Sequence, residues 1–261
     1  MYTFLRAAKI ILILSLLTFT LLPFYLLALL FRDDISRYFP TIWHKVACWS
    51  LGIKINQRGS VSKKQPLMIA ANHSSWIDII ALGSCFPLVF IAKSDVKTWP
   101  IFGFLAKLQR TIFIERTRRS KTKEQVGEIS TRMKHGDIVV LFPEGTTSDG
   151  NYVLPFKSAL FGAVQQAQTD LVDHELFIQP VSIAYLTSHG IPLNRSNRSL
   201  ASWPGDVELL PHLKNIILEG SMGIEITYAD PIKYTEDMSR SEIAKQCETA
   251  VRSCLNASLR Q

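Results

Sequence analysis

The sequence contains little cysteine and none of the spacings that cysteine and histidine form around zinc. Its four cysteines are Cys48, Cys85, Cys247 and Cys254, and they include neither a C-x-x-C pair nor a Cys/His ligand pattern. The scarcity excludes a small domain that is held together by structural zinc. It favours a reduced, cytosol-facing domain with free thiols.

Three common catalytic signatures are also missing. The chain has no G-x-S-x-G, no G-x4-G-K-[ST] and no H-E-x-x-H. These absences argue against a serine hydrolase of the α/β type, a P-loop enzyme and a zinc protease. We therefore expect no metal and no cofactor, and any chemistry must come from ordinary side chains.

The chain is both basic and apolar. Lys and Arg total 29 against 22 Asp and Glu, a formal net charge of +7, while 47% of the residues are hydrophobic. Basic charge can indicate nucleic acid, but no recognised nucleic-acid motif accompanies it. The combination favours an anionic membrane surface or an anionic substrate as the partner, with no nucleic acid.

A long apolar run near the N-terminus predicts a membrane anchor. Residues 10–31 carry no charge over 22 positions, and a helix of that length spans roughly 33 Å, enough to cross a hydrocarbon core. No small-residue cleavage site follows, which argues against a signal peptide. Pro23 and cations at both ends leave two alternatives open, a single span and a kinked or re-entrant helix pair.

The remainder of the chain predicts an α/β fold with a mostly parallel central sheet covered by helices. Short apolar runs alternate with amphipathic stretches, as in a sheet buried on both faces. The expected strands are 66–70, 88–93, 111–115, 137–142, 177–185 and 223–228. The expected helices lie near 76–84, 100–109, 120–135, 157–169, 206–218 and 239–259. We divide the chain into an anchor with interfacial helices, 1–58, and an α/β domain, 59–261, which is the candidate for any catalytic role.

The stretch NHSSWID places His73 and Asp78 five positions apart. On one continuous helix these side chains would diverge, because five residues advance the helix by about 500°. If His73 instead lies in the turn before the helix, its ring can fold back onto Asp78, which leaves the outer ring nitrogen as a general base. The structural alternative is a capping box of Ser75 and Asp78 at a helix start.

Two further strand ends carry polar residues. The segment FPEGTTSDG, 142–150, follows a buried strand, and such a turn is where α/β sheets place ligands. The segment FIER ends another strand with Arg116, and further cations follow it. A plain loop and a solvated charge run are the ordinary interpretations of these two segments.

Together these residues resemble the glycerolipid acyltransferase family, which contains the 1-acylglycerol-3-phosphate acyltransferases. The resemblance rests on four blocks in the expected order, NHSSWID, GFLAKLQRTIFIER, FPEGTTS and QPVSIAY, across residues 72–185. It implies an α/β acyltransferase core joined to an N-terminal membrane-embedded helix or two-helix motif. It also implies attachment to the lipid bilayer of a bacterial-type inner membrane, with the catalytic domain facing the cytoplasm.

The resemblance implies a direct transfer without a covalent enzyme intermediate. His73 would deprotonate the free hydroxyl of a lysolipid, and Asp78 would hold the ring tautomer. The hydroxyl oxygen would then attack the thioester of acyl-CoA or acyl carrier protein. In the family pattern Arg116 meets the acceptor phosphate, and the turn formed by Glu144, Gly145, Thr146 and Thr147 shapes the acceptor pocket.

Position 147 departs from the family pattern. Phosphatidate-forming members usually have arginine there, whereas this chain has threonine, which offers a hydrogen bond but no charge. Lys157 is a candidate replacement for the missing cation. We expect lysophosphatidic acid as the acceptor, with lyso-ornithine lipid or another lysophospholipid as the alternative. A non-catalytic membrane scaffold is the remaining possibility.

Overall fold

The fold is described by a computed structural model that covers residues 2–114, 119–162, 165, 168, 175–205, 207–235 and 237–260. Within these residues nine strands form one sheet, with the main order β1-β8-β6-β2-β5-β3-β4, and β7 and β9 pair with β6. The strands β6, β2, β5, β3 and β4 run parallel to one another, and β8 joins β6 in the antiparallel sense. The predicted α/β class with a mostly parallel sheet is confirmed.

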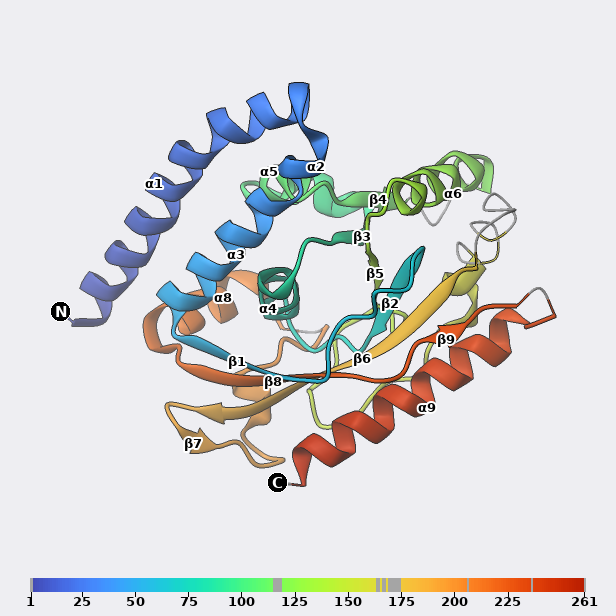
Figure 1. Cartoon of the computed structure of the whole chain (residues 1–261). Helices are drawn as coiled ribbons and strands as arrows, with labels where there is room; N and C mark the ends of the chain where they lie inside the picture. The colour runs from blue at the N-terminus through green and yellow to red at the C-terminus, as the bar shows by residue number, and fades with distance from the viewer. Residues whose placement is uncertain are drawn as a thin grey trace.

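The elements follow the order in which they are coloured in Figure 1. The strands are β1 Ile53–Arg58, β2 Leu67–Ala71, β3 Val89–Lys93, β4 Ile112–Ile114, β5 Val139–Leu141, β6 Phe177–Ser188, β7 Ile191–Pro192, β8 Met222–Tyr228 and β9 Ile232–Lys233. The α-helices are α1 Tyr2–Phe31, α2 Asp33–Ser36, α3 Tyr38–Leu51, α4 Ile77–Cys85, α5 Phe102–Leu108, α6 Arg119–Lys134, α8 Leu209–Glu219 and α9 Arg240–Leu259. Short 3-10 helices are η1 Ser94–Thr98, η2 Ser158–Phe161 and η3 Arg198–Leu200.

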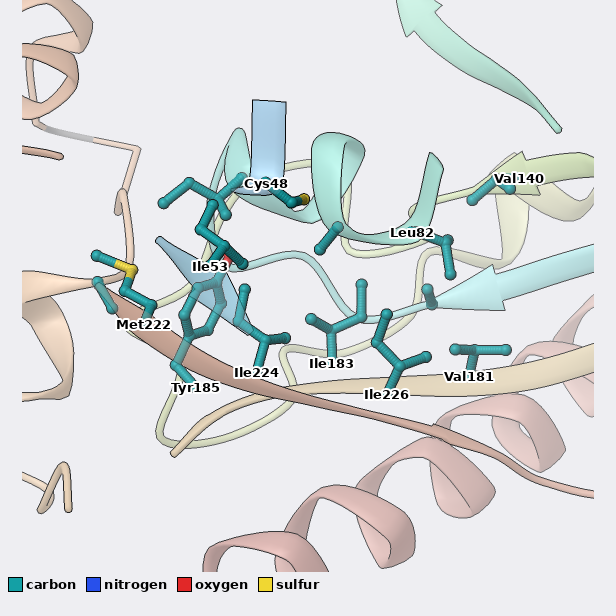
Figure 2. Close-up of a cluster of buried hydrophobic side chains, with 14 of the residues drawn as sticks. Cys48, Ile53, Leu82, Val140, Val181, Ile183, Tyr185, Met222, Ile224 and Ile226 are labelled. Carbon is teal, nitrogen blue, oxygen red and sulfur yellow. The ribbon is translucent and has the colours of Figure 1, made fainter. Parts of the chain in front are cut away.

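The central strand β2 shows why the sheet is covered on both faces. All five of its residues are buried, and because successive side chains point to opposite faces, they divide between two cores. Ile69 and Ala71 belong to the core beneath α3, α4 and α8, shown in part in Figure 2, whereas Met68 and Ala70 belong to the core beneath α6 and α9. Figure 1 shows α9 on one side of β6 and β8, with α3 and α4 on the other.

The helix α9, Arg240–Leu259, matches the expected range 239–259 and begins with a complete cap. Ser239 is the N-cap, its hydroxyl accepts from the Glu242 N–H, and the Glu242 side chain returns to the Ser239 N–H in a capping box. Cys247 is fully buried and Cys254 half-buried. All four cysteines are free.

The N-terminal helix α1 folds back along α3 instead of projecting from the protein. The indole Nε1 of Trp43 donates to the Thr18 hydroxyl at 2.9 Å, and the rings of Tyr25 and Phe39 meet edge to face at 5.8 Å. The stretch from Thr3 to Phe31 is long and apolar enough to cross a membrane, yet only 11% of its most apolar window is buried. The helix α1 therefore packs on α3 as a two-helix motif and keeps most of its apolar surface outside the protein.

Several short elements differ from expectation. We did not predict β1, which pairs with β8 and lies within residues 1–58, nor the two-residue strands β7 and β9. The sequence IKINQR of β1 is mostly polar and only its first residue is buried, so it lacks a buried run. In the expected helix 157–169, η2 occupies the start, and most of the remainder lies outside the described residues.

Candidate active site

The candidate site is built on the turn between β2 and α4. The strand ends at Ala71 and α4 begins at Ile77, so His73 lies in the turn and Asp78 lies in the first helical turn. The imidazole stacks on the Phe142 ring, with centroids 4.1 Å apart and planes 15° apart. Its side chain is 18% exposed. The ring is therefore held from one side and still reaches solvent.

His73 and Asp78 meet as the turn arrangement requires. The ring Nδ1 lies 2.9 Å from Asp78 Oδ2, and because a carboxylate only accepts hydrogen bonds, Nδ1 carries the hydrogen. The tautomer then leaves Nε2 able to take a proton. Such a pair can act as an oriented general base.

The capping interpretation of Asp78 also has support. Its Oδ2 accepts from the backbone N–H groups of Ser74 at 2.7 Å and Ser75 at 2.9 Å. The reciprocal bond of a full capping box is replaced by a bond from Asp78 N to the Ser75 carbonyl at 3.1 Å. One carboxylate therefore closes the helix start and orients the imidazole, so the two interpretations are compatible.

A fourth donor to Asp78 comes from a distant strand. Tyr185, near the end of β6, donates its hydroxyl to Asp78 Oδ1 at 2.6 Å, and both side chains are fully buried. Burial first, and then the neighbouring Asp78 charge, raise the pKa of Tyr185 well above its ordinary value. We assigned no role to this tyrosine from the sequence, although the block QPVSIAY ends on it.

The F-P-E-G turn holds the backbone of His73 from both sides. Glu144 Oε1 accepts from the His73 N–H at 3.1 Å, and the Ser148 N–H donates to the His73 carbonyl at 2.8 Å. Gly145 has a φ of 70°, a left-handed conformation that glycine adopts without strain. Glu144 is 1% exposed, and this burial raises the pKa of its carboxyl to about 8.

The other predicted substrate-binding residues have different settings. Thr147 is buried next to this turn and Thr146 is exposed. Lys157 is exposed, and its backbone N–H donates to the Pro143 carbonyl at 2.9 Å, which places it beside the F-P-E-G turn. Arg116 lies outside the described residues.

The loop after β6 completes the site. The Trp203 N–H donates to the Ser74 carbonyl at 2.6 Å. The Ser74 and Ser148 hydroxyls lie 3.3 Å apart. Trp76 donates from Nε1 to His212 Nδ1 on α8 at 3.0 Å. The turn that carries His73 is thus supported by four segments that are far apart in the sequence: the turn after β5, the strand β6, the loop after β6 and the helix α8.

The fold places the His73 and Asp78 pair at the carboxyl end of a parallel strand, in a chain with an apolar N-terminal helix, and this arrangement suits an α/β enzyme that uses a histidine as a general base. The family model described as Acyltransferase matches residues 52–184. The lyso-ornithine lipid O-acyltransferase of Brucella abortus is 44% identical over 93% of this chain and 91% of that protein. The protein of the same name in Rhizobium meliloti is 40% identical over 100% of this chain and 89% of its own length.

A solved structure supports the same fold. The crystal structure of the 1-acyl-sn-glycerophosphate (LPA) acyltransferase PlsC from Thermotoga maritima matches with a TM-score of 0.62 and 22% identity, over 97% of both chains. The present chain belongs to the acyltransferase family, which confirms the resemblance seen in its sequence blocks. It is an acyltransferase that acts on lysolipids.

Proposed function

We propose that this chain transfers an acyl group from acyl-CoA or acyl carrier protein to the free hydroxyl of lyso-ornithine lipid. The observation that carries the proposal is the near full-length similarity, at 44% and 40% identity, to two proteins of that named activity. Relatives named for 1-acyl-sn-glycerol-3-phosphate are more distant, such as the acyltransferase of Neisseria gonorrhoeae at 27% identity over 79% of this chain, and the Thermotoga maritima structure at 22% identity supports the fold alone. Lyso-ornithine lipid, the alternative acceptor that the sequence left open, therefore replaces lysophosphatidic acid as the first choice.

The chemistry assigned to His73 is a single proton relay. Nε2 takes the proton of the lipid hydroxyl as its oxygen forms a bond to the thioester carbonyl carbon. The carbon–sulfur bond then breaks, and the imidazolium returns the proton to the departing thiolate. Asp78 stabilises the imidazolium through Nδ1 at 2.9 Å and holds the ring in its orientation. The products are the O-acylated lipid and a free thiol.

Thr147 supports an acceptor with less negative charge than a phosphate monoester. Its hydroxyl adds no cation to the buried turn, and a lost ionic contact of roughly 1.5 to 3 kcal/mol weakens binding about 10- to 150-fold. An ornithine head group carries one carboxylate and one ammonium, so a single cation can match its carboxylate. We assign that role to the exposed Lys157, whose backbone is tied to Pro143, and keep Arg116 as a second candidate.

The apolar surface of α1 supports a position on a bilayer. Phe4, Leu12, Phe19 and Leu30 are each more than half exposed, and large exposed apolar surfaces mark membrane or partner contacts. We place the chain on a bacterial inner membrane with the catalytic domain in the cytoplasm, where acyl-CoA and acyl carrier protein are available. The acyl chain of the acceptor can then stay in the lipid while its hydroxyl reaches His73.

A panel of lysolipids tests the acceptor. Purified protein in mixed micelles receives labelled acyl-CoA or acyl carrier protein with lyso-ornithine lipid, lysophosphatidic acid or lysophosphatidylcholine. We expect kcat/KM for lyso-ornithine lipid to exceed that for lysophosphatidic acid at least about tenfold, a difference of roughly 1.4 kcal/mol. Preference for lysophosphatidic acid would refute the acceptor assignment. A complete absence of product with all three acceptors would favour a non-catalytic membrane scaffold.

A further inference from the structure

The hydroxyl of Tyr185 reaches the one carboxylate oxygen of Asp78 that faces away from the histidine. Asp78 Oδ2 receives His73 Nδ1 and two backbone N–H groups, whereas Oδ1 receives Tyr185 at 2.6 Å. Within the described part of the chain, Tyr185 is the donor that serves Oδ1. Figure 2 shows the Tyr185 ring among apolar side chains of the core, next to Ile53 and Met222.

Two polar ties fix where this tyrosine lies relative to the histidine turn. The backbone pairing of β2 with β6 ends at Ala71 and Val181. Beyond it, the Asn72 side chain donates to the Ile183 carbonyl at 2.9 Å and accepts from the Ile183 N–H at 2.8 Å. Arg198 Nε then donates to the Tyr185 carbonyl at 3.2 Å. The position of the hydroxyl is therefore set by contacts that do not involve Asp78.

We infer that Tyr185 is a positioning residue of the acyl transfer: its hydroxyl fixes the Asp78 carboxylate and draws part of its charge away from the imidazole. The inference rests on the proposed role of His73 as the base. A carboxylate with a strong donor on its outer oxygen holds the imidazolium less tightly. The imidazolium therefore gives up its proton to the thiolate more readily. His73 can then act as a base at a lower pH than it could beside an aspartate without this hydrogen bond.

Other titratable groups also face the dyad and must be separated from this effect. Glu144 approaches from the turn after β5, and Cys48 approaches Tyr185 from α3. Burial raises the pKa of Glu144 to about 8 and that of Cys48 to about 12. Burial also lowers the pKa of His212, which accepts from Trp76 in the same turn, so the change in the acid limb between Tyr185→Phe and wild type, rather than its position, reports on the histidine and aspartate pair.

The first test replaces Tyr185 by phenylalanine, with Tyr228→Phe as the matched control. Tyr228 lies on the neighbouring strand β8, is also buried, and donates its hydroxyl to Gln57 Oε1 at 2.9 Å, away from the dyad. For Tyr185→Phe we expect kcat to fall roughly 10- to 100-fold with little change in KM. We also expect the acid limb of kcat/KM to move to higher pH. Tyr228→Phe should change neither quantity.

A second variant keeps the hydroxyl and so guards against a folding defect. Placing 3-fluorotyrosine at position 185 makes the hydroxyl a stronger donor, and we expect the acid limb to move to lower pH. Opposite shifts in the two variants support the positioning role. An unmoved acid limb in the fluorotyrosine protein, or wild-type kcat in Tyr185→Phe, would overturn it.

The two proposals fail in different ways. If His73→Ala retains full acyl transfer, the base is wrong and the role of Tyr185 falls with it. If His73→Ala is inactive and Tyr185→Phe behaves like Tyr228→Phe, the base stands and only the tyrosine assignment is lost.

Discussion

The turn that carries His73 and the helix α1 are stabilised in opposite ways. Hydrogen bonds join the turn around His73 to Glu144, which accepts, to Ser148 and Trp203, which donate, and, through Asp78, to Tyr185. Along α1, few polar ties reach the protein, among them Trp43 to Thr18 and Arg6 to the Leu51 carbonyl. Most of its large apolar side chains are exposed.

This difference separates chemistry from location. Buried polar groups need partners with defined geometry, so the dyad is sensitive to the loss of single atoms. The free energy of burying apolar surface grows with its area and does not depend on direction, so many side chains share the membrane attachment. Changes at the site should therefore alter rates, and changes on α1 should alter where the enzyme lies.

The largest expected effect comes from Asp78→Asn. The amide keeps the shape of the carboxylate but loses its charge, and it offers one acceptor oxygen where two oxygens now receive four donors. We expect kcat to fall about 10²- to 10⁴-fold. Membrane association in flotation assays should be unchanged.

The control for Asp78→Asn is Asp230→Asn, which removes an exposed carboxylate after β8. It should leave steady-state kcat at the wild-type value. Comparable losses in both variants would show that the effect of Asp78 is not local to the dyad.

The helix α1 and the turn around His73 also differ in how much of their structure the sequence could predict. Local patterns were sufficient for α1 and for the buried strand β2, because both depend on neighbours in the chain. The same patterns left the meeting of His73 with Asp78 open beside a helix cap, and the structure shows that Asp78 does both. The hydroxyl of Tyr185 lies 107 positions from Asp78, and the Glu144 carboxyl lies 71 positions from His73. Such contacts depend on sheet order, which spacing along the chain does not encode.

The strand β1 was missed for a related reason. It is an edge strand with only Ile53 buried, so it lacks the apolar run that marked the central strands. Its polar Asn56 and Arg58 both contact Glu225 on β8. The sequence alone could not reveal these contacts, because they form only when β1 pairs with β8.

A smaller effect is expected from Glu144→Gln, measured as stability against pH. The folded protein keeps the Glu144 proton up to a pKa of about 8, whereas the unfolded chain releases it near its ordinary value of 4.5. The free energy of unfolding should therefore fall as pH rises between these values, by on the order of 1.4 kcal/mol per pH unit. The glutamine variant cannot titrate, so its stability should be flatter across this range.

Denaturant unfolding in detergent at pH 5, 6, 7 and 8 provides the measurement. Glu128→Gln, on the exposed side of α6, is the control and should retain the wild-type slope. Parallel curves for Glu144→Gln and wild type would mean that this carboxyl does not hold its proton in the folded state.

The smallest effect on the chemistry is expected on α1. The double change Leu12→Gln and Phe19→Gln removes two exposed apolar side chains. Membrane-bound protein should decrease and the apparent KM for acceptor in vesicles should rise severalfold, with kcat in micelles within about twofold of wild type. Leu210→Gln, an equally exposed change on α8, is the control for a general surface effect. An unchanged membrane fraction would show that α1 is not the anchor.

Single-turnover acyl transfer by His73→Ala tests the central claim most directly. Wild type and variant are each mixed with labelled acyl-CoA or acyl carrier protein and lyso-ornithine lipid, with folding and membrane association verified for both. We predict that the variant forms product at least about 10²-fold more slowly while folding and flotation stay the same. Product formation at the wild-type rate would contradict the assignment of the imidazole as the base.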